Sequence, residues 1–208
     1  MNKLKTVLIV DDHQSMIDSL SLAFSQSNEF EVLGSLKNAD HAELYCSKLK
    51  PDLVLMDVCT EKGASGLEAT KLIKENFPEI KVIVMSGFDE ITYASRAQEA
   101  GANAFVFKSK SLDYFLDIAK GVMEGEAYFP ESKVVITQQG EAPLTEREME
   151  VLRLLCRHMT NKEIADELFI SEHTVKYHKS NMLAKTGFKK SVDLAFYMIS
   201  NGYINPLY

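Results

Sequence analysis

Two kinds of hydrophobic pattern alternate along the first 125 residues. Short apolar runs, several of them rich in β-branched residues, are typical of strands buried on both faces of a sheet, and they lie at 7–10, 32–33, 53–56, 81–85 and 104–107. Between them, apolar residues recur at helical spacing over about 14–26, 39–49, 66–76, 91–100 and 111–124. Five strand–helix units predict an α/β domain with a five-stranded parallel sheet and helices on both faces.

This alternation stops between Gly125 and Pro143, where glycine, proline and glutamine residues gather, so the stretch 125–143 is predicted to be a linker. Beyond it every apolar pattern is helical, over about 145–157, 161–168, 172–185 and 190–200. The sequence therefore predicts an α/β domain over 1–124 and a second, all-α domain of four helices over 144–208.

The ends of these last four helices carry their own signals. Thr145 and Glu148 have the spacing of a capping box, as do Thr160 and Glu163, and Ser171 is a third N-cap candidate. Glycines in the left-handed conformation commonly end helices, and two are expected to do so here: Gly187 and Gly202.

Composition is that of an ordinary globular protein, with 46% hydrophobic and 25% charged residues in 208. No apolar run approaches the roughly 18 residues needed to span a bilayer, and the apolar stretch after the N-terminus is too short for a secretory signal. We therefore expect a cytoplasmic protein with no membrane partner. The three cysteines are odd in number and widely spaced, which favours neither a zinc site nor disulfides: Cys46, Cys59 and Cys156.

The net charge of −7 argues against a protein that binds nucleic acid with its whole surface. The charge is uneven, however, because residues 141–208 contain as many basic as acidic side chains. Within them, residues 172–190 hold five lysines and a single glutamate. A local basic patch on an acidic protein is what a specific DNA contact needs.

Polar residues follow the predicted strands at one end. Asp11 and Asp12 come directly after the first strand, Asp57 ends the third, Ser86 ends the fourth and Lys108 follows the fifth. The carboxyl ends of parallel strands converge at one sheet edge. Three carboxylates there repel one another unless a cation such as Mg²⁺ neutralises them. The set suits phosphoryl transfer onto a carboxylate, with Asp57 as the attacking group.

The motifs around these residues resemble those of a receiver domain, and the resemblance covers residues 5–124. They are Val-Asp-Asp-His at 10–13, Pro-Asp-Leu-Val-Leu-Met-Asp at 51–57, Val-Met-Ser-Gly at 84–87 and Ala-Gly-Ala-Asn-Ala-Phe-Val-Phe-Lys at 100–108. The resemblance implies a doubly wound sheet with strand order 2-1-3-4-5.

The resemblance also implies a role for each position. Asp57 is the phosphoacceptor, and Mg²⁺ is bound by Asp11, Asp12 and Asp57 together with the backbone carbonyl of Cys59. Asp12 is expected to be a more direct ligand than Asp11. The residues that hold the phosphoryl group are Ser86 and Lys108, and Phe105 takes the place of the aromatic switch.

Two positions depart from the receiver pattern. The loop 58–66 is one residue longer than usual and lacks the usual proline, which leaves the geometry on the metal side open. Phe105 has no hydroxyl group, so its switching must rest on packing. In addition, Phe88 lies two residues after Ser86, and we expect it to shield the phosphoryl group from water; Phe88→Ala should then lose phosphate faster.

Residues 161–178 have the pattern of a helix-turn-helix motif. The connection at 169–171 is short, and Ala165 is small enough for two helices to cross closely. The residues expected in its core are Ile164, Ala165, Leu168, Ile170 and Val175.

The second helix of this motif is expected to place one face in the major groove of DNA. Its inward positions are Val175, His178 and Met182, with His178 interpreted as a packing residue rather than a base reader. The opposite face carries Lys176, Tyr177 and Ser180, flanked by Lys179. Backbone amides at helix N-termini favour phosphate, which predicts phosphate contacts near Thr160, Asn161, Lys162 and Thr174.

The C-terminal segments resemble the LuxR-type DNA-binding domain over residues 144–202. The matching stretches are Leu-Thr-Glu-Arg-Glu-Met-Glu-Val-Leu-Arg-Leu-Leu at 144–155, Asn-Lys-Glu-Ile-Ala at 161–165 and Ile-Ser-Glu-His-Thr-Val-Lys-Tyr-His at 170–178. At 189–191 the chain has Lys-Lys-Ser where the family more often has an arginine.

Joined to a receiver, this domain resembles the NarL/FixJ family of two-component response regulators. The resemblance implies double-stranded DNA and a histidine kinase as partners, transcription regulation as the output, and a homodimer on activation. The expected dimer surfaces are the last helix, about 190–200, and a face of the receiver that the sequence does not identify.

Three other interpretations stay open from the residues alone. A Mg²⁺-dependent phosphatase-type enzyme has a similar acidic edge, although it usually needs a second carboxylate where this chain has Cys59. Another is a receiver that accepts no phosphate and is controlled by a protein partner. For the C-terminal domain, a helical protein-interaction module with a lysine-rich face is the alternative.

Overall fold

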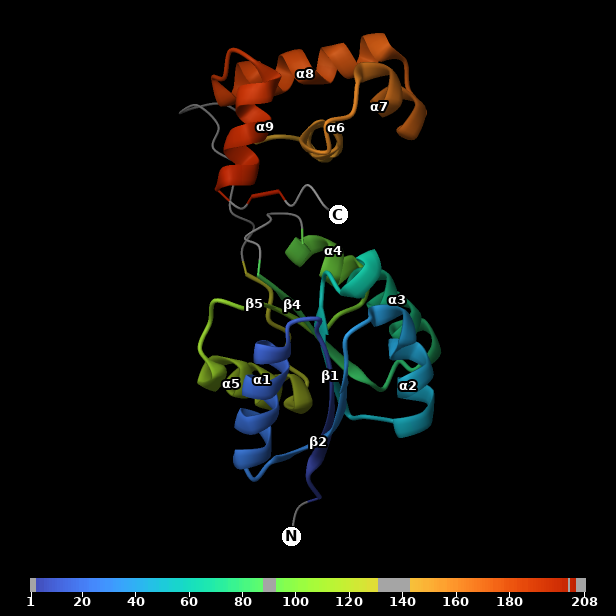
Figure 1. The fold of residues 1–208 in the computed structure, drawn as a ribbon, viewed down its shortest axis with the longest axis vertical. Coiled ribbons are helices and arrows are strands. Elements are labelled where there is room, and N and C mark those ends of the chain that lie inside the picture. Colours follow the sequence, from blue (N-terminus) through green and yellow to red (C-terminus); the bar gives the residue numbers. More distant parts are fainter. Residues whose placement is uncertain (1–2, 88–92, 131–142, 202, 205–208) are drawn as a thin grey trace. The chain divides into compact units, whose positions relative to one another are not determined.

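The computed structural model describes residues 3–87, 93–130, 143–201 and 203–204, and it divides the chain into two compact units (Figure 1). The first unit contains the described residues up to Pro130, and the second contains those from Pro143 onward. Phe88, most of the predicted linker and Gly202 lie outside the described residues.

The first unit is built on a five-stranded parallel sheet with the order β2-β1-β3-β4-β5, which confirms the predicted topology. The strands are β1 (Lys5–Val10), β2 (Phe30–Leu36), β3 (Leu53–Asp57), β4 (Lys81–Ser86) and β5 (Ala104–Phe107). Every residue of β3 is buried, because helices cover the sheet on both sides. The strand predicted at 32–33 is longer than expected, since polar Glu31 and Ser35 interrupt its apolar pattern.

Helices α1 (Gln14–Gln26) and α5 (Leu112–Glu124) cover one face of this sheet, and α2 (Ala42–Leu49), α3 (Gly66–Asn76) and α4 (Tyr93–Glu99) cover the other (Figure 1). Each face has its own apolar cluster, because neighbouring strand residues point in opposite directions. Val54 packs toward α2–α4, for example, and Leu55 toward α1 and α5. The helix predicted at 39–49 begins with a 3₁₀ turn, η1 (Ala39–His41).

After α5 the chain turns back along β5. Gly125 ends the helix in the left-handed conformation with φ of 100°. The amide of Phe105 then donates a hydrogen bond of 2.8 Å to the carbonyl of Tyr128, and the Tyr128 amide donates one of 3.3 Å to Asn103. We call residues 126–130 the docked segment. The linker was predicted to begin at 125, but these residues pack on the first unit.

Gly121 on α5 faces the side chains of the docked segment. A Cβ at this buried helix position would lie 2.7 Å from a carboxylate oxygen of Glu126 and would crowd the Tyr128 ring as well. The Tyr128 hydroxyl in turn donates a hydrogen bond to Glu126. A larger side chain at position 121 would therefore have to displace the outer ends of the Glu126 and Tyr128 side chains.

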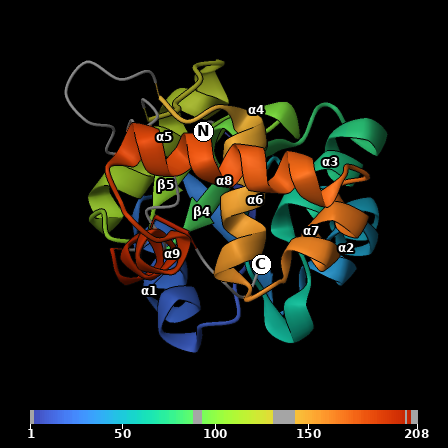
Figure 2. The ribbon, with the colours of Figure 1, turned by 90° about the horizontal axis from the view of Figure 1, so that it is seen from above.

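The second unit contains the four predicted helices, α6 (Glu146–Cys156), α7 (Asn161–Glu167), α8 (Glu172–Thr186) and α9 (Ser191–Ser200). Figure 2 shows α8 crossing α6. The capping boxes at Thr145 and Thr160 are both formed, Ser171 caps α8, and Gly187 ends it with φ of 76°. The predicted core positions Ile164, Ala165 and Val175 are buried, and Leu168 and Ile170 are partly buried against the same cluster.

No helix among the described residues is long and apolar enough to cross a membrane.

Candidate functional site

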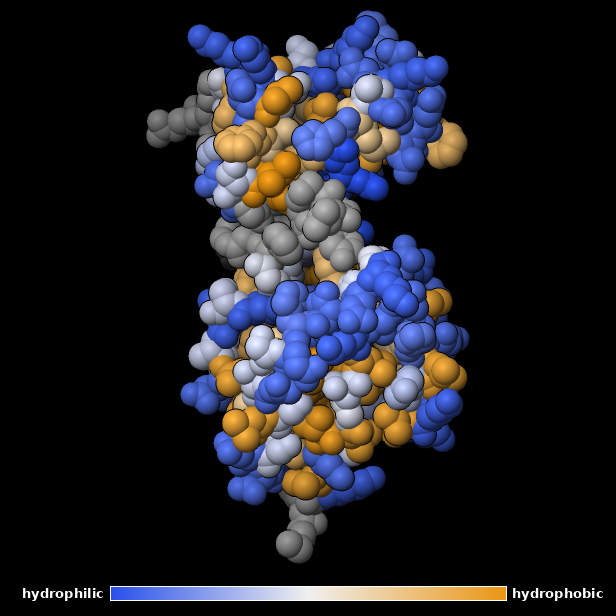
Figure 3. All heavy atoms as spheres, viewed as in Figure 1, coloured by the Kyte–Doolittle hydropathy of each residue, from blue (hydrophilic) through white to orange (hydrophobic). Residues whose placement is uncertain are grey.

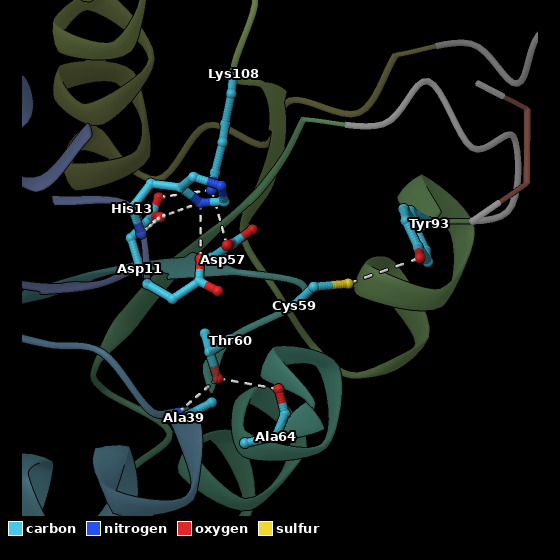
Figure 4. Close-up of polar contacts among 10 residues, drawn as sticks. Asp11, His13, Ala39, Asp57, Cys59, Thr60, Ala64, Tyr93 and Lys108 are labelled. Atoms are coloured by element: carbon cyan, nitrogen blue, oxygen red, sulfur yellow. Dashed lines mark hydrogen bonds and ion pairs between the residues drawn. The ribbon is translucent and has the colours of Figure 1, made fainter. Parts of the chain in front are cut away.

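The carboxyl edge of the sheet brings together side chains that are far apart in sequence. The Lys108 ammonium lies 2.7 Å from Oδ2 of Asp11 and 2.8 Å from Oδ2 of Asp57 (Figure 4). Asp11 is fully buried and Asp57 is 3% exposed. Lys108 follows β5, whereas the two aspartates come from β1 and β3, so the lysine reaches across the position of β4. The sequence predicted this convergence from the strand ends.

The charges at this edge do not balance. Burial raises the pKa of Asp57 to about 6, with Lys108 lowering it and Asp11 raising it further. Burial alone would lower the pKa of Lys108, but Asp57 and Asp11 raise it above its ordinary value. One ammonium group therefore serves two buried carboxylates, and the site keeps an excess of negative charge.

His13 and Asp12 extend the cluster toward solvent. Nδ1 of His13 lies 2.7 Å from Oδ1 of Asp12 and 3.3 Å from Oδ1 of Asp11, and the His13 amide donates to the same Asp11 oxygen at 2.9 Å. His13 belongs to the Val-Asp-Asp-His motif at 10–13, but the receiver resemblance implies no role for it. Only its position directly after the two aspartates signalled it.

This cluster has the chemistry of a divalent cation site. Ligand atoms of Asp11, Asp12, His13 and Asp57 all lie within 4.8 Å of one another. Among the described residues, Oδ1 of Asp12 accepts no aligned hydrogen bond, and Oδ2 of Asp11 has the Lys108 ammonium at 2.7 Å as its near polar neighbour. Buried carboxylate oxygens left in this state fit Mg²⁺, which prefers such ligands.

Ser86 and Phe105 lie on the strands beside the acidic cluster. Ser86 is buried at the end of β4, and its carbonyl accepts a hydrogen bond of 2.7 Å from the Lys108 amide. Phe105 is buried on β5 with its ring edge-to-face against Phe107, the ring centres being 5.2 Å apart. Phe105 also lines a groove of about 310 Å³ that Tyr114 and the docked segment complete.

The loop after Asp57 is held by Thr60. Its hydroxyl accepts a hydrogen bond of 2.9 Å from the Ala39 amide and donates one of 3.0 Å to the Ala64 carbonyl (Figure 4). The 3₁₀ turn η2 (Glu61–Gly63) lies between these anchors, with Lys62 at φ of 62° and Gly63 at φ of 76°. Through this turn the chain passes from the end of β3 to the start of α3.

Cys59 lies at the base of this loop. It pairs with Ser65 in an antiparallel bridge whose hydrogen bonds are made by the flanking residues, from Gly66 to Val58 and from Thr60 to Ala64. The Cys59 amide hydrogen-bonds Asp57 and so lowers its pKa. On its other side, Cys59 Sγ is 3.9 Å from the Tyr93 hydroxyl (Figure 4).

Gly66 is a site residue that sequence reasoning missed. A Cβ here would overlap the carbonyl oxygen of Asp57 and lie 2.9 Å from its carbonyl carbon. The first residue of α3 must therefore be glycine for the helix to approach the end of β3. A glycine at the close of the loop was visible in the sequence, but the contact that requires it was not.

The predicted DNA-facing side of α8 is exposed. Lys176, Tyr177 and Ser180 are all exposed, while Val175 and Met182 are buried. Hydrophilic side chains gather over α7 and α8 in Figure 3. His178 is half-buried, with its ring edge-to-face against Tyr177 at 5.7 Å between ring centres.

Other predicted DNA contacts already have partners within the domain. Lys179 Nζ donates to Oδ1 of Asn161 at 3.0 Å, and burial lowers the pKa of Lys179. The Thr160 hydroxyl donates to Glu163 at 2.7 Å, and the hydroxyls of Thr174 and Ser171 lie 2.8 Å apart. Lys162 is exposed.

Fewer lysines of the basic segment 172–190 are available for DNA than its sequence suggests. Lys185 lies 2.8 Å from the carboxylate of Glu148, which is buried. Together with Lys179, two of the five lysines in 172–190 are thus engaged inside the domain. The exposed lysines of the segment are Lys176, Lys189 and Lys190.

Two family models together match most of the chain. Residues 7–120 match the response regulator receiver domain, and residues 142–198 match the bacterial regulatory proteins of the luxR family. The chain therefore belongs to the response regulators of the NarL/FixJ type, with a receiver and a LuxR-type DNA-binding domain. This membership confirms the predicted resemblance and sets aside the phosphatase-type enzyme.

Individual relatives agree with this assignment. Response regulator protein VraR of Staphylococcus aureus is 34% identical over 206 residues, which cover 95% of this chain and 98% of VraR. VraR of Staphylococcus epidermidis is 33% identical over the same span.

Solved structures share the fold at lower identity. A structure of the RcsB response regulator of Salmonella typhimurium has a TM-score of 0.61 and 24% identity, covering 96% of this chain and all of that one. RcsB of Salmonella enterica serovar Typhimurium, bound to a promoter in the presence of the phosphomimetic BeF₃⁻, has a TM-score of 0.66 and 23% identity, covering 94% of this chain and 98% of that one.

Proposed function

We propose that Asp57 accepts a phosphoryl group from a histidine kinase and that this modification controls dimerisation and DNA binding. The observation that carries the proposal is the Lys108 ammonium held between the buried carboxylates of Asp11 and Asp57. Such a group at a strand edge, beside an uncompensated carboxylate, is suited to receive the charge of a phosphoryl group.

The reaction needs Asp57 as a carboxylate, which is its main form above a pH of about 6. An oxygen of Asp57 attacks the phosphorus of a phosphohistidine, and the phosphorus–nitrogen bond breaks as the new phosphorus–oxygen bond forms. Lys108 then contacts the phosphoryl oxygens in place of one carboxylate, and the Ser86 hydroxyl donates a hydrogen bond to them.

A magnesium ion would be held by Asp11, Asp12 and Asp57 with the backbone carbonyl of Cys59. When bound, Mg²⁺ neutralises charge on the phosphoryl oxygens. Support for these ligands comes from the two carboxylate oxygens that lack hydrogen bonds. The bridge between Cys59 and Ser65 is closed by flanking residues, which is compatible with a ligand role for the Cys59 carbonyl. By the same chemistry, the receiver would catalyse its own phosphorylation and dephosphorylation.

The switch would act through packing at Phe105. When the phosphoryl group draws Ser86 inward, the Phe105 ring has the neighbouring groove as a second position. Since Phe105 has no hydroxyl group, this second position is stabilised by contacts with apolar and aromatic side chains alone. The groove includes Phe107 and Tyr114, which offer such contacts.

Dimerisation would use α9 together with a face of the receiver. Val192 is 74% exposed and Phe196 is 71% exposed, and four residues apart they share one face of this helix. Two domains joined in this way would bind paired half-sites, which raises the effective concentration of the second contact. Because the proposed partner is double-stranded DNA, the protein would act in the cytoplasm.

DNA contacts are assigned to the exposed side of α8. Lys176 would contact guanine or phosphate, and Tyr177 a thymine methyl or phosphate. The other assigned contacts orient the domain on the backbone: Thr160, Asn161, Lys162, Thr174, Lys179 and Ser180. RcsB, whose fold this chain shares, was solved on a promoter in the presence of the phosphomimetic BeF₃⁻, which is compatible with DNA binding by a phosphorylated receiver.

One experiment tests this proposal. The full chain is treated with beryllofluoride and Mg²⁺, and its oligomeric state and retention of DNA are measured, with Asp57→Ala as the control. We expect dimers and stronger DNA retention in the wild type and neither in the variant. If the oligomeric state and DNA retention of the wild type do not change, a receiver that is controlled by a protein partner is favoured instead.

A further inference from the structure

His13 lies within the acidic cluster but has no part in the function proposed above. We propose that His13 is a side-chain ligand of the divalent-metal site, so that the site favours ions with affinity for imidazole nitrogen, such as Co²⁺ and Ni²⁺, over Mg²⁺. This inference rests on the metal site of the proposed function, and it assigns that site a preference among ions.

The spacing of the donor atoms is the first argument. Neighbouring ligands of an octahedral ion lie roughly 3 Å apart when each bond is about 2.1 Å long. Nδ1 of His13 is 2.7 Å from Oδ1 of Asp12 and 3.3 Å from Oδ1 of Asp11, which brackets that edge length. A ligand atom of Asp57 completes a group that lies within 4.8 Å.

The orientation of the contact is the second argument. Oδ1 of Asp12 has no hydrogen bond, even though the His13 nitrogen is only 2.7 Å away. The two atoms are therefore close without being aligned as donor and acceptor. Two ligands that face one ion have this relation, because each directs its lone pair at the ion rather than at the other ligand.

Charge is the third argument. Asp11, Asp12 and Asp57 carry three negative charges, and Lys108 supplies one positive charge. A divalent ion balances the remainder, so a fourth donor need not carry a charge, and an imidazole nitrogen meets that requirement. The His13 side chain is 69% exposed, so its ring has room to adjust, while its amide is tied to Asp11 at 2.9 Å.

A nitrogen donor changes which ions the site prefers. Mg²⁺ is a hard ion that favours oxygen ligands, whereas affinity for nitrogen rises through Co²⁺ and Ni²⁺ along the first transition row. His13 would thus add little to Mg²⁺ binding and much to Co²⁺ binding.

The test compares two ions on the full chain. Binding of Co²⁺ and of Mg²⁺ is measured by titration calorimetry on wild type and His13→Gln, and the visible absorption of bound Co²⁺ is recorded. The matched control is His173→Gln, an exposed histidine in the first turn of α8. In His13→Gln we expect the ratio of Co²⁺ to Mg²⁺ affinity to fall about tenfold or more, since even a lost outer-shell partner of a metal ligand has effects of that size. The Co²⁺ spectrum should change in His13→Gln and stay as in wild type in His173→Gln.

Two results would overturn the inference. An unchanged affinity ratio and spectrum in His13→Gln would show that the imidazole does not bind the ion. Tighter binding of both ions would show that His13 is instead a positive counter-ion that the metal displaces. Failure of the proposed metal site would give a different result. In that case Asp57→Asn would not weaken the binding of Co²⁺ or of Mg²⁺ relative to wild type.

Discussion

Lys108 and Lys185 each form ion pairs with buried carboxylates, one in each domain, yet their surroundings differ. Lys108 serves both Asp11 and Asp57, and the pKa of Asp57 is raised to about 6. Lys185 serves Glu148 alone. Burial would raise the pKa of Glu148, but Lys185 and the Thr145 amide lower it below the ordinary value.

The difference separates a site from a structural contact. The carboxylate of Glu148 has its charge and its hydrogen bonds satisfied, so nothing further needs to bind there. At the sheet edge, one lysine faces too many carboxylates, and the excess charge is available for a cation and a phosphoryl group. A buried ion pair therefore indicates a binding site when its charges do not balance, and its presence alone does not.

The largest effect is expected from Lys185→Met. It leaves Glu148 buried without its cation, and breaking such a pair typically lowers the free energy of unfolding by about 3–5 kcal/mol. Urea denaturation of the full chain, with hydrogen exchange of residues 144–200, measures the loss. Lys189→Met, on an exposed lysine nearby, is the control and should change little. Equal free energies of unfolding for Lys185→Met and Lys189→Met would show that the ion pair between Lys185 and Glu148 contributes nothing to stability.

Asp57→Asn should have the opposite sign. The folded chain holds the Asp57 proton more tightly than the unfolded chain, so the wild type loses stability as pH rises from about 4 to about 6. The variant avoids this loss and should be more stable by about 3 kcal/mol at pH 7, the value of a shift of about two pKa units. Thermal unfolding in a chelator at pH 4 and pH 7 measures it. Equal stability of the two proteins at pH 7 would contradict the raised pKa.

Lys176→Ala tests the exposed charge of the second unit. Loss of a base contact by this lysine should weaken DNA binding by about 1–3 kcal/mol without changing stability. Affinity for several DNA sequences, measured at fixed salt, separates the two roles of Lys176. Loss confined to some sequences indicates a base, and uniform loss indicates a phosphate. Lys48→Ala in α2 is the control. If it weakens DNA binding as much as Lys176→Ala does, Lys176 makes no specific contact with DNA.

The smallest effect is expected from Ser171→Ala. The Ser171 hydroxyl accepts a hydrogen bond of 3.0 Å from the Thr174 amide, and loss of such a cap lowers the free energy of unfolding by about 1 kcal/mol. Ser171→Asp should restore the cap. Chemical denaturation of both variants decides whether α8 depends on it, and equal stability of the Ala and Asp variants would show that it does not.

Much of the receiver site could be predicted from the sequence because its residues stand at strand ends. Asp11, Asp57 and Lys108 each follow a short apolar run, and parallel topology alone brings such positions together. Gly66 could not be predicted in this way, because the need for glycine arises from the approach of α3 to β3.

The second unit shows the limits of reading charge from sequence. Lys179 and Lys185 count as basic residues of one segment, but their partners, Asn161 and Glu148, lie 18 and 37 residues away. Only the packing of the four helices reveals these contacts. The docked segment was likewise hidden, since its flanking glycine and proline are typical of a linker while Tyr128 packs on the sheet.

The docked segment also protects the receiver from association through its sheet. β5 is the last strand of the order β2-β1-β3-β4-β5, and an uncovered edge strand can pair with another chain. Tyr128 occupies the hydrogen-bonding position at Phe105 and so covers part of that edge. Release of residues 126–130 would expose this part of β5 for pairing with another chain, so a short stretch with the composition of a linker also has the role of an edge cover.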